Sequence, residues 1–188
     1  LVLGGGRGLG SLPPKQERLV NKMIDPNIAV DHFMTVGTNH HVCQDYVISS
    51  QTEPARLILS DGCSSSPDTD IGSRLWTRSA CKSLRRDCDP IWPARLFSAT
   101  ELVERDEKDL IYLSELLGKK VREVGILLNL PWTMADCTLL MAYRAGGSTR
   151  VIILGDGIFF VKRGDELNIF RIEFTHNAPL YPNYFLDG

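Results

Sequence analysis

The chain has 188 residues, and its 21 lysines and arginines against 23 aspartates and glutamates give a formal net charge of −2. Hydrophobic residues make up 43% and charged residues 23%, values typical of an ordinary globular domain. This composition excludes a disordered chain, a collagen-like repeat and a protein that binds polyanions through bulk positive charge. No apolar run approaches the ~20 residues of a transmembrane helix. We therefore expect neither nucleic acid nor a membrane as partner.

The first third of the chain predicts an arm followed by strands. Residues 1–26 are rich in glycine, then proline, then charge, and indicate a flexible arm ahead of a domain spanning 27–188. Apolar residues alternate with period two over 28–36, which predicts a strand. Two further apolar runs, 46–48 and 57–59, enclose a polar loop and predict a hairpin.

Two helices are expected next. A loop dense in turn-forming residues, 61–68, precedes apolar residues at helical spacing over 69–84. The second helix is expected over 107–128, and Pro131 ends it.

The last third is rich in short β-forming runs separated by glycine-containing turns. We expect an antiparallel meander with strands at 138–143, 151–154, 158–161 and 167–174. Strands, then helices, then strands, without βαβ alternation, favour an α+β fold in which helices pack on antiparallel sheet.

The cysteines indicate free thiols. Their number is odd and no pair has C-x-x-C spacing, so a reducing compartment is expected, and with no recognisable secretory signal we expect a cytoplasmic protein. None has an arginine six positions later, which excludes a cysteine-dependent phosphatase. The five are Cys43, Cys63, Cys81, Cys88 and Cys137.

The glycines near the N-terminus have the spacing of a dinucleotide-binding turn. Gly6, Gly8 and Gly10 would let the backbone approach a pyrophosphate. Pro13-Pro14 follows where a helix would have to begin, and no βαβ unit is present, so a tail is favoured. The alternative, a nucleotide site, predicts NAD(P) binding that depends on these three glycines.

Two aspartates occupy strand ends that an antiparallel hairpin brings together. Asp45 precedes the strand at 46–48, and Asp61 follows the strand at 57–59. Both carboxylates should therefore lie at one rim of the sheet. Hard divalent ions such as Mg²⁺ and Mn²⁺ prefer oxygen ligands, and the carbonyl of Gly62 would offer another.

Several motifs in this order resemble the metal-dependent type-2C protein phosphatases, over residues 28–182. The Cys-Gln-Asp-Tyr and Asp-Gly-Cys-Ser segments are similar to a bacterial branch of that family. The matching segments are Gln44-Asp45, Asp61-Gly62, Asp136-Cys137-Thr138, Gly155-Asp156-Gly157 and His176-Asn177-Ala178-Pro179.

The resemblance implies an antiparallel β-sandwich with helices on its outer faces, and hydrolysis of phosphoserine and phosphothreonine in a phosphoprotein partner. It implies two Mg²⁺ or Mn²⁺ ions with a bridging water. By position, Asp45 would bind the second metal, Asp61 would bridge both, and the Gly62 carbonyl would bind one. Asp136 and Asp156 match positions that shape the sheet.

Departures from the family pattern leave alternatives open. His40 stands where the family commonly has a phosphate-binding arginine, and we assign it a catalytic role in binding phosphate, although it could be a polar turn residue. Family members continue with further acidic strand ends, so we expect this chain to hold about the first two thirds of a catalytic domain, and Asp187 is too near His176 to be one of those ligands. The alternative function is an inactive, phosphatase-like binding or regulatory module.

Overall fold

The structure is a computed structural model that describes residues 29–36, 41–51, 55–86, 107–145, 148–174 and 179–185. The predicted arm at 1–26, the turn at Gly6, Gly8 and Gly10, and Cys88 lie outside these residues. The elements are β1 (Tyr46–Ser50), β2 (Arg56–Ser60), α1 (Thr69–Arg86), α2 (Glu107–Leu127), η1 (Trp132–Ala135), β3 (Leu139–Ala145), β4 (Ser148–Leu154), β5 (Gly157–Arg163), β6 (Glu166–Ile172) and η3 (Pro182–Phe185).

The strands form a four-stranded sheet and a separate hairpin, and every pair is antiparallel. The sheet order is β1-β2-β3-β4, and β5 pairs with β6 alone. The predicted hairpin is confirmed by the register that places Tyr46 opposite Ser60. β2 then pairs with β3, which lies beyond both helices in the chain, and Leu59 faces Leu140.

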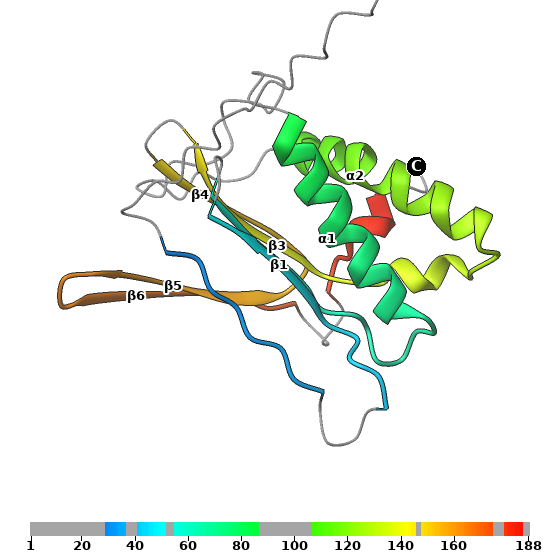
Figure 1. The fold of residues 1–188 in the computed structure, drawn as a ribbon, viewed down its shortest axis with the longest axis horizontal. Helices are drawn as coiled ribbons and strands as arrows, with labels where there is room; N and C mark the ends of the chain where they lie inside the picture. Colours follow the sequence, from blue (N-terminus) through cyan, green and yellow to red (C-terminus); the bar gives the residue numbers. More distant parts are fainter. Residues whose placement is uncertain are drawn as a thin grey trace, which may run out of the picture.

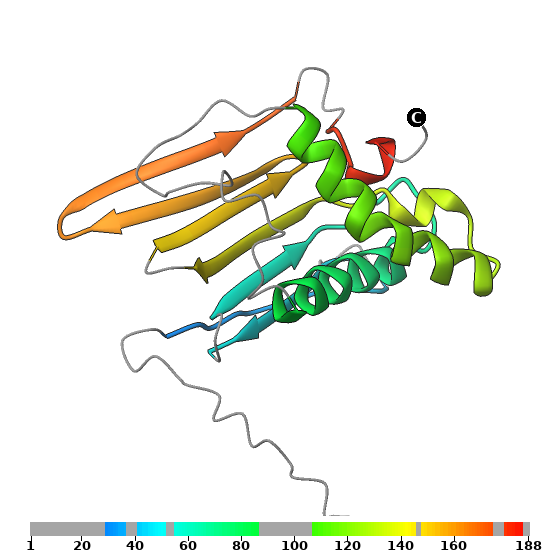
Figure 2. The same ribbon diagram turned by 90° about the horizontal axis from the view of Figure 1, so that it is seen from above.

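Both described helices cover the same face of the four-stranded sheet, while β5 and β6 lie on its other side (Figure 1). Seen from above, the strands run side by side in projection, and α1 and α2 lie in front of one end of them (Figure 2). The α+β class with antiparallel sheets is therefore confirmed. A complete sandwich with helices on both outer faces remains a prediction, because the described strands supply one full sheet and a hairpin.

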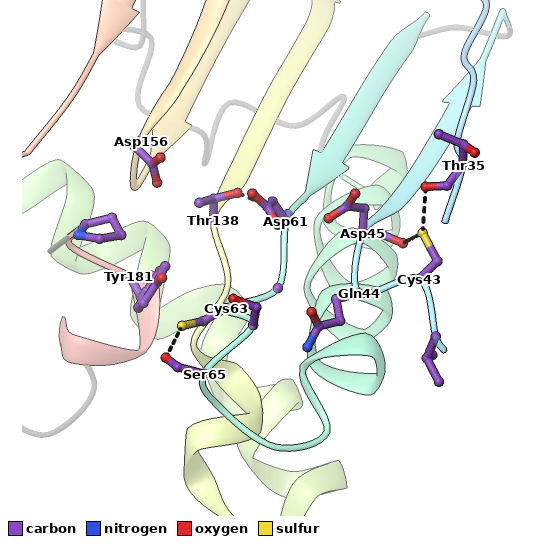
Figure 3. Close-up of a pocket in the computed structure, with 14 residues that line it drawn as sticks. Thr35, Cys43, Gln44, Asp45, Asp61, Cys63, Ser65, Thr138, Asp156 and Tyr181 are labelled. Carbon is purple, nitrogen blue, oxygen red and sulfur yellow. Dashed lines mark hydrogen bonds between the residues drawn. The ribbon is translucent and has the colours of Figure 1, made fainter. Parts of the chain in front are cut away.

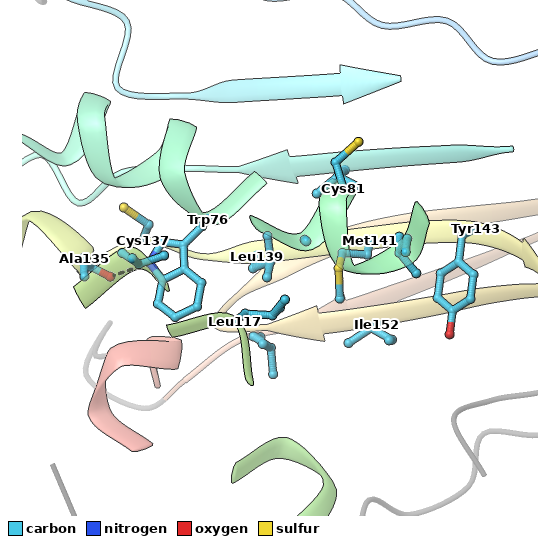
Figure 4. Packing of buried hydrophobic residues seen from close by; sticks show 14 of the residues in the cluster. Trp76, Cys81, Leu117, Ala135, Cys137, Leu139, Met141, Tyr143 and Ile152 are labelled. Carbon is cyan, nitrogen blue, oxygen red and sulfur yellow. Dashed lines mark hydrogen bonds between the residues drawn. The ribbon is translucent and has the colours of Figure 1, made fainter. Parts of the chain in front are cut away.

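The core lies between the helices and the sheet. Alternation along the strands points Ile58, Met141 and Ile152 toward the helices, where each is at most 1% exposed. Trp76 of α1 is fully buried among them, and its Nε1 donates to the carbonyl of Ala135 at 3.1 Å (Figure 4). This hydrogen bond satisfies the indole N–H that burial would otherwise leave without a partner.

The contact between α1 and η1 is possible only because residue 72 is glycine. A Cβ at Gly72 would lie 1.7 Å from the carbonyl oxygen of Met134. The backbone of η1 therefore packs directly against the helix, and this close packing fixes where the following strand, β3, begins.

Residues 29–36 differ from the prediction of a strand. The segment forms no β ladder, although it lies beside β1, with His32 Nδ1 2.8 Å from Ser49 Oγ. Its apolar side chains find little cover, since Phe33 is 85% and Val36 47% exposed. Alternating apolar residues therefore predicted a paired strand here, but no neighbouring surface in the described part of the chain buries one face of the segment.

The described cysteines are free thiols, as predicted, and Cys81 and Cys137 are buried. Neither described helix has the length and apolar character that crossing a membrane would require.

Candidate metal centre

Asp45 and Asp61 meet at one rim of the sheet, as the hairpin predicted. Tyr46 pairs with Ser60, so the residues just outside this pair, Asp45 and Asp61, face each other at the ends of β1 and β2. Their carboxyl groups lie close enough for Asp45 to raise the pKa of Asp61, and both side chains line the same cavity (Figure 3). Two carboxyl groups this close need either a proton or a cation between them.

The raised pKa of Asp61 reflects this need for a proton or a cation. Burial, the hydrogen bond with Asp45 and the negative charges of Asp45 and Asp156 raise the pKa of Asp61 to about 7. The side chain of Asp61 still reaches the cavity and its solvent. A divalent cation at this position would favour the ionised form and remove the repulsion.

The backbone around Asp61 is anchored to the start of β3. Its N–H donates to Thr138 Oγ1 at 3.1 Å, and its carbonyl accepts from the N–H of Thr138 at 2.8 Å. Ser60 Oγ donates to the carbonyl of Thr138 at 2.6 Å, and the N–H of Cys63 donates to the carbonyl of Asp136 at 2.8 Å. These bonds extend the β2–β3 ladder past its end and hold Asp61 on a rigid support.

Gly62 allows the loop after β2 to pack against the N-terminus of α1. A Cβ at this residue would lie 2.8 Å from Cβ of Thr69 and 2.9 Å from the carbonyl oxygen of Gln44. Gln44 Nε2 donates to Thr69 Oγ1 at 3.0 Å, and that hydroxyl donates to the carbonyl of Cys63 at 3.1 Å. Thr69 thus links the segment carrying Asp45 to the loop that follows Asp61.

The cavity is acidic. Its volume is about 670 Å³, and its lining includes three carboxylates, from Asp45, Asp61 and Asp156, but no lysine, arginine or histidine of the described residues. Hydroxyl and amide groups make up most of the remaining polar lining. An anionic phosphate would be repelled from such a cavity unless cations were bound there.

Asp156 reaches the cavity from the turn between β4 and β5 (Figure 3). The sequence predicted that Asp156 shapes the sheet. In the structure its negative charge also raises the pKa of Asp61. Asp136 has the shaping role: it is 7% exposed and accepts hydrogen bonds from Ser66 Oγ at 2.7 Å and Asn183 Nδ2 at 2.6 Å.

The wall opposite Asp45 contains Cys63 and Tyr181. Cys63 Sγ and Ser65 Oγ share a hydrogen bond of 3.0 Å, and the Tyr181 hydroxyl interacts with the thiol strongly enough to lower its pKa. Burial raises the pKa of Cys63, but the hydrogen bonds from Ser65 and Tyr181 outweigh it, so the net direction is downward. Burial and the neighbouring Cys63 raise the pKa of Tyr181, whose hydroxyl therefore stays protonated as a donor.

The sequence did not point to Tyr181, because no motif surrounds it and its segment is placed by contacts distant in the chain, among them the hydrogen bond from Asn183 to Asp136. His40, assigned a phosphate-binding role, lies outside the described residues. Among the residues that the structure describes, no three or more histidines, cysteines, aspartates and glutamates are grouped closely enough to hold a metal ion. Asp45 and Asp61 are the pair of carboxylates that face each other at this rim.

The sequence profile of the family Protein phosphatase 2C matches residues 37–178, which is most of the chain and includes both carboxylates. Comparisons with curated proteins and with solved structures gave no match. The matched range begins before β1 and extends past β6, so it covers the sheet, both helices and most of the cavity lining, whereas Thr35, Pro179 and Tyr181 of that lining fall outside it. The chain therefore belongs to the Protein phosphatase 2C family.

Proposed function

We propose that this chain takes part in the metal-dependent hydrolysis of phosphoserine and phosphothreonine in proteins, with Mn²⁺ or Mg²⁺ as cofactor. Family membership supports phosphatase chemistry. The observation that carries the metal dependence is the facing pair Asp45 and Asp61 in a cavity whose described lining has no cationic side chain.

The residues present fit a divalent cation. The carboxyl groups of Asp45 and Asp61 face each other, and Asp45 raises the pKa of Asp61, so a cation between them would take the place of the proton. We propose that both carboxylates and the carbonyl of Gly62 are ligands. When bound, such ions lower the pKa of a coordinated water from ~15.7 toward neutrality and neutralise charge on the phosphate.

Other cavity residues are suited to bind the phosphoryl group. The hydroxyls of Ser64, Ser65 and Tyr181 line the cavity and supply neutral hydrogen-bond donors for phosphate oxygens. We propose that His40, in its protonated form, contributes a positive charge that attracts the phosphate. The neutral donors are needed because the described lining supplies no arginine or lysine for this role.

The decisive experiment replaces Asp61 with Asn. Asp61→Asn should abolish saturable Mn²⁺ binding by titration calorimetry and reduce Mn²⁺-dependent hydrolysis of an aryl phosphate by about a hundredfold or more, because losing even a residue that only supports a metal ligand typically costs about 10–100-fold in metal affinity. The matched control is Asp68→Asn, an exposed residue of the same loop with φ +56, a conformation that Asn tolerates well. Unchanged turnover in Asp61→Asn would refute the proposed role.

A second candidate function is a phosphatase-like binding module without metal. The observation that favours it is the lack of a three-ligand acidic or histidine cluster among the described residues. It predicts that the unaltered chain binds no Mn²⁺ saturably and still binds phosphoserine peptides, and calorimetry with each ligand separates the two functions.

A further inference from the structure

Helix α1 carries a concentrated positive charge in a chain whose net charge is negative. Its 18 residues include one acidic residue, Asp70, against five basic ones. Three of the basic side chains, Arg74, Arg78 and Lys82, are exposed and follow one another at intervals of four residues. Residues at this spacing lie on one face of a helix, so these three form a continuous basic ridge.

The basic ridge is not explained by the stability of the helix. Within the described part of the chain, no salt bridge joins Arg74, Arg78 or Lys82 to a carboxylate; the ion pair found there is between Arg171 and Glu173. Like charges at i and i+4 destabilise a helix by roughly 0.2–0.5 kcal/mol per pair. The ridge therefore has unused capacity to bind anions.

Two of the guanidinium groups are held in place by one aromatic ring. The guanidinium carbon of Arg74 lies 5.6 Å from the centroid of the Tyr46 ring, and that of Arg78 lies 5.9 Å from it. Arg78 Nη2 also donates to the Tyr46 hydroxyl at 3.3 Å. Cation–π contacts of this kind orient a guanidinium without using all its N–H donors, which remain available for a carboxylate.

The basic ridge begins at the rim of the acidic cavity. Tyr46 directly follows Asp45, and consecutive Cα atoms are about 3.8 Å apart. Thr69, the first residue of α1, is bonded by Gln44 of the cavity lining. Arg74 lies five residues further along, roughly 7.5 Å up the helix axis, and α1 continues across β1 and β2 away from the cavity (Figure 1).

From this arrangement we propose that the basic ridge binds aspartate and glutamate side chains of the phosphoprotein substrate, next to the phosphorylated residue. The proposal rests on the proposed phosphatase function. The ridge attracts carboxylates that flank the phosphorylated residue, so charge sets the direction in which the substrate lies. The ridge from Arg74 to Lys82 is about 12 Å long, a length that roughly four residues of extended peptide span.

The test uses two fluorescent phosphoserine peptides that differ only in four flanking positions, which are Asp and Glu in one and Asn and Gln in the other. The test protein is the double variant Arg74→Gln/Arg78→Gln. The matched control is Lys119→Gln/Lys162→Gln, which removes the same charge from exposed residues of α2 and β5. Fluorescence anisotropy of the metal-free proteins gives the ratio of the two Kd values, in which the repulsion of the shared phosphate cancels, and hydrolysis with Mn²⁺ gives kcat/KM.

We expect the unaltered chain to favour the acidic peptide by about tenfold in both Kd and kcat/KM at low salt, as expected for two or three partly exposed charge contacts. The double variant should reduce this preference to about threefold or less, whereas the control variant keeps it. Hydrolysis of an aryl phosphate, which has no flanking residues, should be the same in all three proteins.

Three results would overturn the proposal. Equal binding of both peptides by the unaltered chain would exclude selective contacts with the flanking carboxylates. An equal loss of the preference in the control variant would show that it comes from the net charge of the protein and not from the ridge. Tighter binding of a single-stranded oligonucleotide, lost in the double variant, assigns the ridge to nucleic acid instead. If neither peptide is hydrolysed, but the unaltered chain still binds the acidic peptide more tightly and the double variant does not, the proposed phosphatase function is wrong and the proposed role of the basic ridge in binding is supported.

Discussion

Two sides of the acidic cavity, the Asp61 wall after β2 and the Asp45 wall before β1, are held in place by different numbers of hydrogen bonds. The Asp61 wall continues the β2–β3 ladder, with backbone hydrogen bonds of 2.8 Å to Thr138 and from Cys63 to Asp136. The Asp45 wall extends from β1, the edge strand of its sheet, and Gln44 joins it to α1 through one side-chain hydrogen bond. A cation between these walls would thus have one rigid and one adjustable carboxylate, so disturbing the first should cost more.

Forcing the two walls apart with an added methyl group should have the largest effect. Gly62→Ala places a methyl group 2.8 Å from Cβ of Thr69 and 2.9 Å from the Gln44 carbonyl, and overpacking of this kind destabilises by about 1–3 kcal/mol. We also expect Mn²⁺ affinity to fall at least tenfold, because Asp45 moves with Gln44. Urea unfolding and calorimetry measure the two effects.

The control for Gly62→Ala is Gly125→Ala. There the added methyl meets the terminal methyl of Met134 at 2.7 Å, a flexible contact that can move aside. An equal loss of Mn²⁺ affinity in both variants would contradict the explanation by wall geometry.

Weakening the rigid wall should have the next largest effect. Thr138→Val removes the hydroxyl that accepts from the N–H of Asp61, and an unsatisfied donor in a partly buried position costs about 1–3 kcal/mol. Thr138→Ser keeps the hydroxyl and should retain most of the stability and Mn²⁺ affinity. If Thr138→Ser is as impaired as Thr138→Val in chemical unfolding, the methyl group and not the hydrogen bond supports Asp61.

Weakening the adjustable wall should cost less. Gln44→Leu removes the donor to Thr69 Oγ1, but that hydroxyl keeps its own bond to the carbonyl of Cys63, so we expect a loss of about 0.5–1.5 kcal/mol. Gln44→Glu, which keeps the shape and reverses the hydrogen-bond direction, is the companion variant. A loss for Gln44→Leu as large as that for Thr138→Val in the same unfolding assay would show that the walls are equally stiff.

The smallest effect is a pH dependence of the metal-free protein. Because the pKa of Asp61 is raised from 3.8 to about 7 in the folded state, that state holds the proton more tightly than the unfolded chain does. The contribution of Asp61 to stability is therefore greatest below pH 4 and is lost as pH rises through about 7.

Thermal unfolding between pH 5 and pH 8 checks this dependence against Asp61→Asn, in which residue 61 does not titrate. The unaltered chain should lose more stability over this interval than the variant does, and saturating Mn²⁺ should remove the difference. Parallel pH profiles without metal would show that Asp61 is ionised throughout.

Local pattern predicted the elements well where burial agrees with it. Helix 69–84 is observed as Thr69–Arg86 and helix 107–128 as Glu107–Leu127, because apolar spacing matches the buried faces. The strand expected at 28–36 failed for the opposite reason, since alternating apolar residues such as Val36 remain exposed. A periodic pattern predicts a strand only when a neighbouring surface covers one of its faces.

By itself, the sequence determined the α+β class, the β1–β2 hairpin and hence the meeting of Asp45 with Asp61, because all three follow from residues close together in the chain. Only the tertiary structure decided that Thr138 would anchor Asp61, and that Asp156 and Tyr181 would reach the same cavity. Thr138 lies 77 residues from Asp61. No local spacing encodes a contact over that distance; it forms because α1 and η1 pack closely enough at Gly72 to bring β3 beside β2.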